Sequence, residues 1–252
     1  MILHPSSAQA KRAAQSGKQA QPIWTAIQAA QLKKAAKCID QIDHARLAGE
    51  IAQHLDPAIV QPLDAALLDA ISLHDEGWGE LDSKPPVRTF LDVQPLDFLK
   101  AWRASIAAAR QASELGGLMV AGHFHRLGKA RLEQGANTPT DGKLLQEFIS
   151  EQEELRGRLQ ATASFSQEQL ESLIDVLQFC DVFSLYLCSG ADERVQLPQR
   201  IGGIIFQLYR QNDWCVTSPP LFSVNIQLEV KTWEVTRKGT KGEPAILDFQ
   251  LR

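Results

Sequence analysis

The chain has 252 residues, of which 44% are apolar and 22% charged, and its formal net charge is −4. This composition is ordinary for a soluble globular protein, and the length suffices to bury a full core without disulfides. No apolar run approaches the roughly 20 residues that span a bilayer. The N-terminus lacks the basic region and apolar stretch of a secretory signal. We therefore expect a cytoplasmic protein with no membrane partner.

Cysteine usage favours the same compartment. The chain contains Cys38, Cys180, Cys188 and Cys215, and no two of them have the two-residue gap of a zinc knuckle or a thioredoxin-type site. Cys180 and Cys188 fall in an apolar helical stretch, where a free cysteine behaves as a small hydrophobic residue. A reduced setting fits this pattern best.

Residues 1–38 form a basic arm rich in Ala and Gln, since no acidic residue precedes Asp40. Its cationic residues are Lys11, Arg12, Lys18, Lys33, Lys34 and Lys37. The arm could contact nucleic acid or another anion, or it could be a solvated helix or tail. We favour the second interpretation, because the charges are dilute and no aromatic cluster supports base stacking. Nucleic acid is therefore an unlikely partner for the acidic remainder of the chain.

Helical periodicity then dominates the chain. We expect helices over about 43–55, 63–77, 96–114, 118–127, 140–159 and 166–188. Pro57 stops the first helix, and Gly77 suits the end of the second. Residues 78–95 form a long irregular loop, of a kind that is often functional in compact domains. Ser166 and Gln169 have the spacing of a capping box at the start of the last helix.

The period changes near the C-terminus. Residues 222–231 alternate between apolar and polar, as in a strand with one buried face, and 247–251 alternate again. Residues 201–209 are a weaker strand candidate. The predicted fold class is therefore mainly α, a helical bundle with a small C-terminal antiparallel β-element. We divide the chain into the arm (1–38), a helical metal-binding domain (39–200) and a β-element packed on it (201–252).

Several ionisable residues occupy positions where the helical pattern calls for an apolar core residue. They are His44, His74, His123 and Asp181, with Asp75 beside His74. A lone inward histidine is more often a satisfied core residue than a ligand, and a lone buried aspartate usually caps or pairs with an arginine. Several such residues, each on the buried face of a different helix, are harder to explain one by one, because buried charges must be paired or must bind a metal. Histidine and carboxylate together suit divalent Fe, Mn, Co, Ni or Zn, bound as one or two ions.

The order of histidine, His-Asp doublet and distant aspartate resembles the HD-domain superfamily of metal-dependent phosphohydrolases. The stretches QIDHARLAG (41–49), LHDEGW (73–78) and CDVFSLY (180–186) also resemble an uncharacterised bacterial family with HD-like motifs. The resemblance implies an HD-like helical bundle whose metal ligands are His44, His74, Asp75 and Asp181. Members of that family begin with short strands, where this chain has its basic arm.

The implied activity is hydrolysis of a phosphomonoester or phosphodiester, of a small molecule or a nucleotide, by a metal-activated water. His123 would stabilise the phosphoryl charge or hold a second ion, and Glu76 would act as an outer acid or base. Substrate would contact Lys84 and Arg88, which could bind anions, with Trp78 and the more peripheral His125. Simpler explanations are solvation of the two cations and helix-end packing of Glu76 and Trp78.

Two alternatives remain open at this point. The first is an HD-type di-iron oxygenase acting on a small molecule, with a ligand set formed by His44, His74, Asp75, His123, His125 and Asp181. The second is a non-catalytic HD-like binding module. The sequence does not fix the oligomeric state, and a homodimer is one option.

Overall fold

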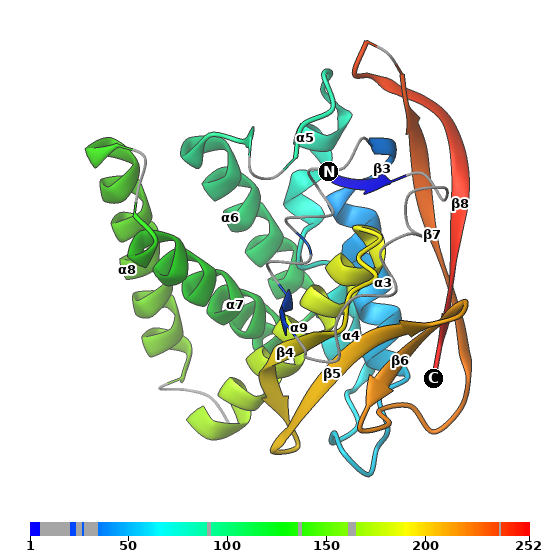
Figure 1. Ribbon diagram of the computed structural model, residues 1–252. Helices are drawn as coiled ribbons and strands as arrows, with labels where there is room; N and C mark the ends of the chain where they lie inside the picture. The colour runs from blue at the N-terminus through cyan, green and yellow to red at the C-terminus, as the bar shows by residue number, and fades with distance from the viewer. Residues whose placement is uncertain are drawn as a thin grey trace.

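The structure is a computed structural model that describes residues 1–5, 21–23, 27, 35–89, 92–135, 138–160, 165–236 and 238–252. A layer of helices lies against a mixed sheet (Figure 1). The strand order in the sheet is β1-β3-β7-β8-β6-β5-β4-β2. In Figure 1, α6, α7 and α8 lie on the side of the molecule away from β7 and β8, with α3 and α9 between them.

The predicted helices are present, with shifted ends. The helical elements are α3 (Gln41–Gln53), α4 (Ala65–Ser72), η1 (Glu76–Trp78), α5 (Gly79–Ser83), α6 (Pro95–Ala112), α7 (Glu114–Glu133), α8 (Pro139–Gln160) and α9 (Gln167–Cys188). The capping box at Ser166 and Gln169 is confirmed. The expected loop over 78–95 contains α5, and α7 is longer than predicted at both ends. None of the helices in the described ranges combines the length and apolar character needed to cross a membrane.

The strands come from both ends of the chain. They are β1 (Ile2–Pro5), β2 (Gln21–Pro22), β3 (Ala35–Ile39), β4 (Val195–Ile201), β5 (Ile204–Gln211), β6 (Trp214–Ser218), β7 (Ile226–Val235) and β8 (Lys241–Leu251). The predicted alternation is confirmed in β7, where Ile226, Leu228 and Val230 are buried between exposed neighbours. β7 pairs antiparallel with β8, and β6 pairs parallel with β8. The sheet is therefore mixed.

The predicted fold class was wrong. The β-structure is not small, and it is not confined to the C-terminus, because β1 and β3 of the N-terminal arm join the same sheet through the pairing of Cys38 with Trp233. It is not purely antiparallel either, because β6 and β8 are parallel. The short β3 segment has no alternating pattern, so its strand conformation depends on its partners more than on its own propensity. The arm's cations other than Lys37 lie outside the described residues. The division of the chain into three segments stays a prediction.

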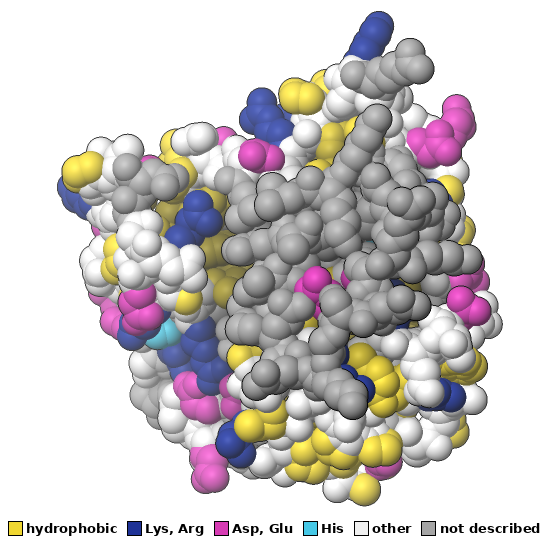
Figure 2. All heavy atoms as spheres, in the orientation of Figure 1, with side chains coloured by type: hydrophobic (Ala, Val, Ile, Leu, Met, Phe, Trp, Pro, Cys, Tyr) yellow, Lys and Arg dark blue, Asp and Glu magenta, His cyan; other side chains and the backbone are white. Residues whose placement is uncertain are grey.

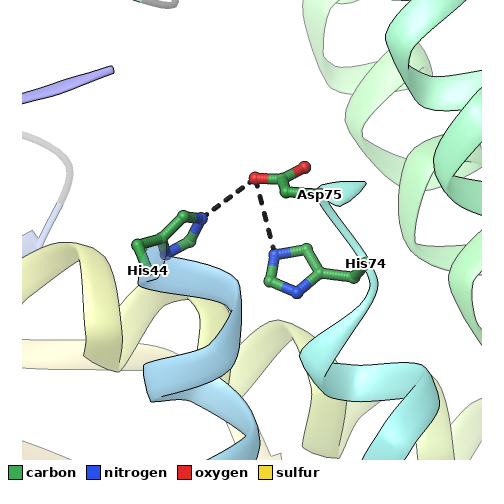
Figure 3. Close-up of side chains that lie close together, drawn as sticks. All are labelled: His44, His74 and Asp75. Carbon is green, nitrogen blue, oxygen red and sulfur yellow. Dashed lines mark hydrogen bonds and ion pairs between the residues drawn. The ribbon is translucent and has the colours of Figure 1, made fainter. Parts of the chain in front are cut away.

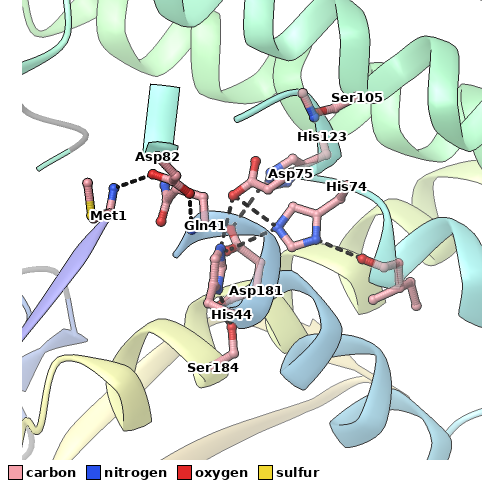
Figure 4. A network of polar contacts seen from close by, with 12 residues as sticks. Met1, Gln41, His44, His74, Asp75, Asp82, Ser105, His123, Asp181 and Ser184 are labelled. Carbon is pink, nitrogen blue, oxygen red and sulfur yellow. Dashed lines mark hydrogen bonds and ion pairs between the residues drawn. The ribbon is translucent and has the colours of Figure 1, made fainter. Parts of the chain in front are cut away.

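α9 lies at the centre of the molecule and contacts α3, α7 and β4. Its second half, residues 176–188, is buried on all sides, so a polar side chain there has little access to water. α4 ends at Ser72, earlier than expected, and His74 and Asp75 lie in the turn that leads into η1. This turn presents both side chains of the doublet toward α3 and α9 (Figure 4).

Gly77 fixes the position of that turn against α6. A Cβ atom at this position would lie 2.0 Å from the Ala101 backbone carbonyl oxygen and 2.8 Å from the Ala104 Cβ. The Gly77 N–H also donates to the Ser105 hydroxyl at 3.0 Å. The glycine predicted to end a helix thus allows close packing of η1 on α6.

We expect Gly77→Ala to lower the free energy of unfolding by about 1–3 kcal/mol, because the backbone of α6 must move to accept the methyl group. Gly79→Ala is the matched control, since a Cβ there would meet no atom of the described residues within 4 Å. Urea denaturation of both variants measures the difference. Equal stability of the two variants would contradict the packing role of Gly77.

Candidate metal centre

Five ionisable side chains meet in the interior between α3, α7, α9 and the turn before η1. His44, His74 and His123 are each 1% exposed, Asp181 is 5% exposed and Asp75 is 6% exposed. Figure 3 shows His44 and His74 on either side of the Asp75 carboxylate. Two groups, His44–His74–Asp75 and His74–His123–Asp181, each offer three ligand atoms within 4.8 Å of one another. The predicted convergence of these side chains is confirmed.

The ring of His44 is oriented by Ser184, one turn beyond Asp181 on α9. The Ser184 hydroxyl donates its proton to the Asp181 carbonyl oxygen at 2.8 Å, so its oxygen accepts from His44 Nδ1–H at 2.7 Å. In the neutral ring, Nε2 then carries the lone pair. That atom lies 3.0 Å from Asp75 Oδ2 and 3.7 Å from Asp181 Oδ1.

His74 is oriented in the same sense by the backbone. Its Nδ1–H donates to the Ile71 carbonyl oxygen at 2.8 Å. Its Nε2 lies 3.5 Å from Asp181 Oδ1 and 3.7 Å from Asp75 Oδ2, and it has no hydrogen-bond partner among the described residues. His44 and His74 therefore both direct Nε2 toward the same pair of carboxylates.

His123 faces the other carboxylate oxygen of Asp181, and Figure 4 draws it with the same group of side chains. Its Nε2 lies 3.7 Å from Asp181 Oδ2, and its buried Nδ1 meets no hydrogen-bond partner in the part of the chain that the structure describes. Its ring packs edge-on against His74, with centroids 5.5 Å apart. His123 therefore belongs to the same cluster as the doublet.

Burial and the carboxylates compete to set the charges of the cluster. Burial disfavours the imidazolium form, but Asp75 and Asp181 outweigh it and raise the pKa of His74 to about 9. Burial alone would raise the pKa of Asp181, yet the three histidines lower it to about 2. Burial lowers the pKa of His123 to about 4 in spite of Asp181. In the metal-free protein, a proton on His74 thus balances part of the carboxylate charge.

The cluster can hold a metal ion. Because the Nδ1–H groups of His44 and His74 are engaged, their Nε2 atoms face carboxylate oxygens as acceptors across 3.0–3.7 Å. Acceptors that face one another need a shared cation or proton. Two buried carboxylates without compensation would cost several kcal/mol. A divalent ion bound by nitrogen and oxygen would neutralise both, and imidazole ligands favour a transition metal over Ca or Mg.

Two of the other predicted residues lie apart from the cluster. Glu76 is exposed at the start of η1, and no described contact joins it to the histidines. His125 points away from His123 on α7, and its Nε2 lies 3.0 Å from Glu153 of α8. Lys129 pairs with the same carboxylate. The structure therefore gives no geometric support for an ion bound by His125.

The remaining predicted residues come together elsewhere. Trp78, Lys84 and Arg88 line a single pocket of about 220 Å³, with Met1, Leu81, Asp82, Pro85 and Val93. Trp78 is 4% exposed, whereas Lys84 and Arg88 are exposed. Their assignment to substrate stays a prediction, but they share one concave surface.

Two polar residues of the site had no predicted role. Ser184 follows Asp181 by three residues on α9, and Gln41 precedes His44 by three residues on α3. This spacing places each residue on the same helix face as the nearby ligand. It is the feature of the sequence from which their place in the site could have been predicted. Gln41 is 5% exposed, and its side-chain oxygen meets no hydrogen-bond partner among the described residues.

Comparison with known proteins identifies the family and no more. A family model described as a protein of unknown function, DUF3891, matches residues 29–236, and the chain belongs to this family. No curated protein matches the chain, and no solved structure matches it. The resemblance to an uncharacterised family is therefore confirmed, whereas membership of the HD-domain superfamily stays a prediction.

We expect Ser184→Ala to weaken metal binding by about 10–100-fold, the range typical of residues that orient a histidine ligand. The variant removes the acceptor that holds His44 Nδ1–H while leaving every ligand atom in place. Ser189→Ala is the matched control, because Ser189 also donates to the carbonyl three residues before it and does not contact the cluster. Calorimetric titration with Zn or Mn measures both. Equal affinities would contradict the orienting role.

Metal binding should also release about one proton per ion near neutral pH, because Nε2 of His74 must lose its proton to bind a metal. With the pKa of His74 raised to about 9, the apparent affinity should increase about tenfold per pH unit from about pH 6.5 to about pH 8.5. Calorimetry in buffers of different ionisation enthalpy counts the protons. No proton release, together with an affinity that does not change with pH, would contradict this charge assignment.

Proposed function

We propose that the protein is a metal-dependent phosphohydrolase that acts on a phosphomonoester or phosphodiester of a small molecule or nucleotide. The observation that carries the proposal is the buried cluster of three histidines and two aspartates, with Nε2 of His44 and of His74 directed at the carboxylates of Asp75 and Asp181. The order of these residues along the chain, as in HD-domain proteins, supports phosphoryl chemistry.

We propose that the site holds one ion. Both ligand groups use His74, whose Nδ1 is engaged by the Ile71 carbonyl oxygen. Only Nε2 remains, and one imidazole nitrogen binds one ion. His44, His74, Asp75 and Asp181 would be ligands, with His123 as a fifth ligand or as a donor to the phosphoryl group.

When bound, a divalent ion would supply an activated water and would neutralise charge on the phosphoryl oxygens. The protein side chains supply the rest. Ser184 and the Ile71 carbonyl hold two imidazoles in the orientation that binding requires, before substrate arrives. The low pKa of His123 keeps its ring neutral, so the ring adds no positive charge that would repel a cation. Burial excludes bulk water, which strengthens the electrostatic interactions within the site.

Two rival functions follow from the same cluster. A di-iron oxygenase was expected to use His125 as a sixth ligand, and the contact of His125 with Glu153 favours the hydrolase instead. A non-catalytic binding module needs no turnover, so kinetic measurements separate it from an enzyme.

We expect His74→Ala and Asp181→Ala to lose bound metal. Asp75→Asn should lower the rate of hydrolysis by more than about 100-fold, which exceeds the roughly 10–100-fold loss typical of residues that only support a metal ligand. Elemental analysis gives the metal content. Turnover of p-nitrophenyl phosphate and bis-p-nitrophenyl phosphate with Mn, Ni or Fe gives the activity.

The control is His125→Ala, which should keep both metal and activity. Unchanged metal content in His74→Ala and Asp181→Ala would overturn the ligand assignment. Bound metal without hydrolysis of either ester would favour a rival function, and iron-dependent consumption of dioxygen would identify the oxygenase.

A further inference from the structure

Two hydrogen bonds connect the walls of the pocket lined by Trp78 to the segments that carry the metal ligands. Trp78 belongs to the turn that follows Asp75, and its backbone N–H donates to the Asp75 carbonyl oxygen at 3.0 Å. On the other side, the Asp82 carboxylate of the pocket accepts from the Gln41 backbone N–H at 2.5 Å, one turn before His44 on α3. Figure 4 shows Asp82 and Gln41 beside the cluster. The wall of the pocket is therefore joined directly to the segments that carry Asp75 and His44.

The interior of the pocket suits an uncharged, flat group. The buried indole of Trp78 forms part of its wall, together with the apolar side chains of Leu81 and Val93. The indole N–H of Trp78 is buried and donates to no acceptor among the described residues. Asp82 adds no free charge, because it accepts hydrogen bonds from Gln41 and from the Met1 amino group. Ring stacking on the indole is the interaction that such a wall offers.

The rim of the pocket suits an anion. Among the described residues, Arg88 has no ion-pair partner, and Lys84 pairs only with the exposed Glu80. Such an exposed ion pair contributes little to stability. On the face seen in Figure 2, acidic and basic side chains are interspersed among the residues drawn in colour. Arg88 and Lys84 together therefore place two cationic side chains at the rim of this pocket, where they would attract a phosphorylated compound.

The size of the pocket limits the ligand. At about 220 Å³, it is smaller than the roughly 300–1,000 Å³ of typical sites for drug-sized molecules. It has room for a single ring or a short chain and not for a dinucleotide. Building on the proposed phosphohydrolase function, we propose that this pocket binds the organic group of the substrate, a single planar ring carried by a phosphomonoester, with the phosphoryl group toward the metal centre.

The test is calorimetric binding of two non-hydrolysable probes, phenylphosphonate and methylphosphonate, to the metal-loaded protein. We expect the phenyl compound to bind about tenfold more tightly, because only its ring reaches the indole. Trp78→Leu should abolish this preference, whereas Trp78→Phe should retain most of it. Arg88→Ala should weaken both probes alike, in a salt-dependent manner.

The controls are Trp214→Leu and Arg200→Ala on the sheet, which should match the unmodified protein. Because Trp78 is buried, Val93→Phe provides a second test that fills the pocket without removing the indole, and it should also abolish the preference. Equal affinities of the two probes, or a preference that survives both Trp78→Leu and Val93→Phe, would overturn the proposal.

Failure of the pocket and failure of the proposed function give different results. Metal binding and ester hydrolysis without a ring preference would overturn the pocket assignment alone. A ring preference that depends on Trp78, in a protein without hydrolysis, would support the pocket and overturn the phosphohydrolase.

Discussion

The structure depends on one electrostatic constraint, a carboxylate held in the middle of the central helix α9. Asp181 occupies a stretch in which every neighbouring side chain is buried, so water cannot stabilise its charge. Three imidazoles surround it, and together they keep its pKa low despite burial. Because those rings come from α3, α7 and the turn before η1, the charge at the centre ties together helices that are distant in the sequence. Fold and site therefore share the same contacts, and neither can be altered without affecting the other.

The imidazole rings of His44 and His74 are also held by hydrogen bonds on the side away from the carboxylates. Ser184 and the Ile71 carbonyl oxygen take up the Nδ1–H groups of His44 and His74, and Gly77 lets η1 approach the α6 backbone closely enough to hold the doublet in place. None of these supports carries charge, so they fix orientation without competing for a cation. Such preorganisation is what a metal centre requires of its outer residues. The nearby pocket is part of the same arrangement, since its Trp78 wall continues directly from the turn that carries Asp75.

The site could be predicted from the sequence more completely than the fold. His44, His123 and Asp181 interrupt apolar helical stripes, and this local signal indicated a shared site, whereas the ligand set came from the resemblance to HD-domain proteins. The sheet gave a weaker signal, because β3 has no alternation and pairs with β7 across almost 200 residues of chain. Such pairing is decided by tertiary context, which local propensity does not encode. The family that the chain resembles begins with short strands, but the composition of the basic arm departs from that pattern and favours a helix or a tail, and the N-terminal strands were therefore missed.

The pairing of β3 with β7 has a consequence for synthesis. On the ribosome, α3 to α9 emerge well before residues 226–235, so the helices can assemble around Asp181 while β3 still lacks its neighbour β7. During that interval the edge of β3 opposite β1 presents unpaired N–H and C=O groups, which are the usual starting points for association between chains. Yield from a cell should thus depend on how fast the C-terminal hairpin arrives, and chaperones that shield open strands should matter most in that window.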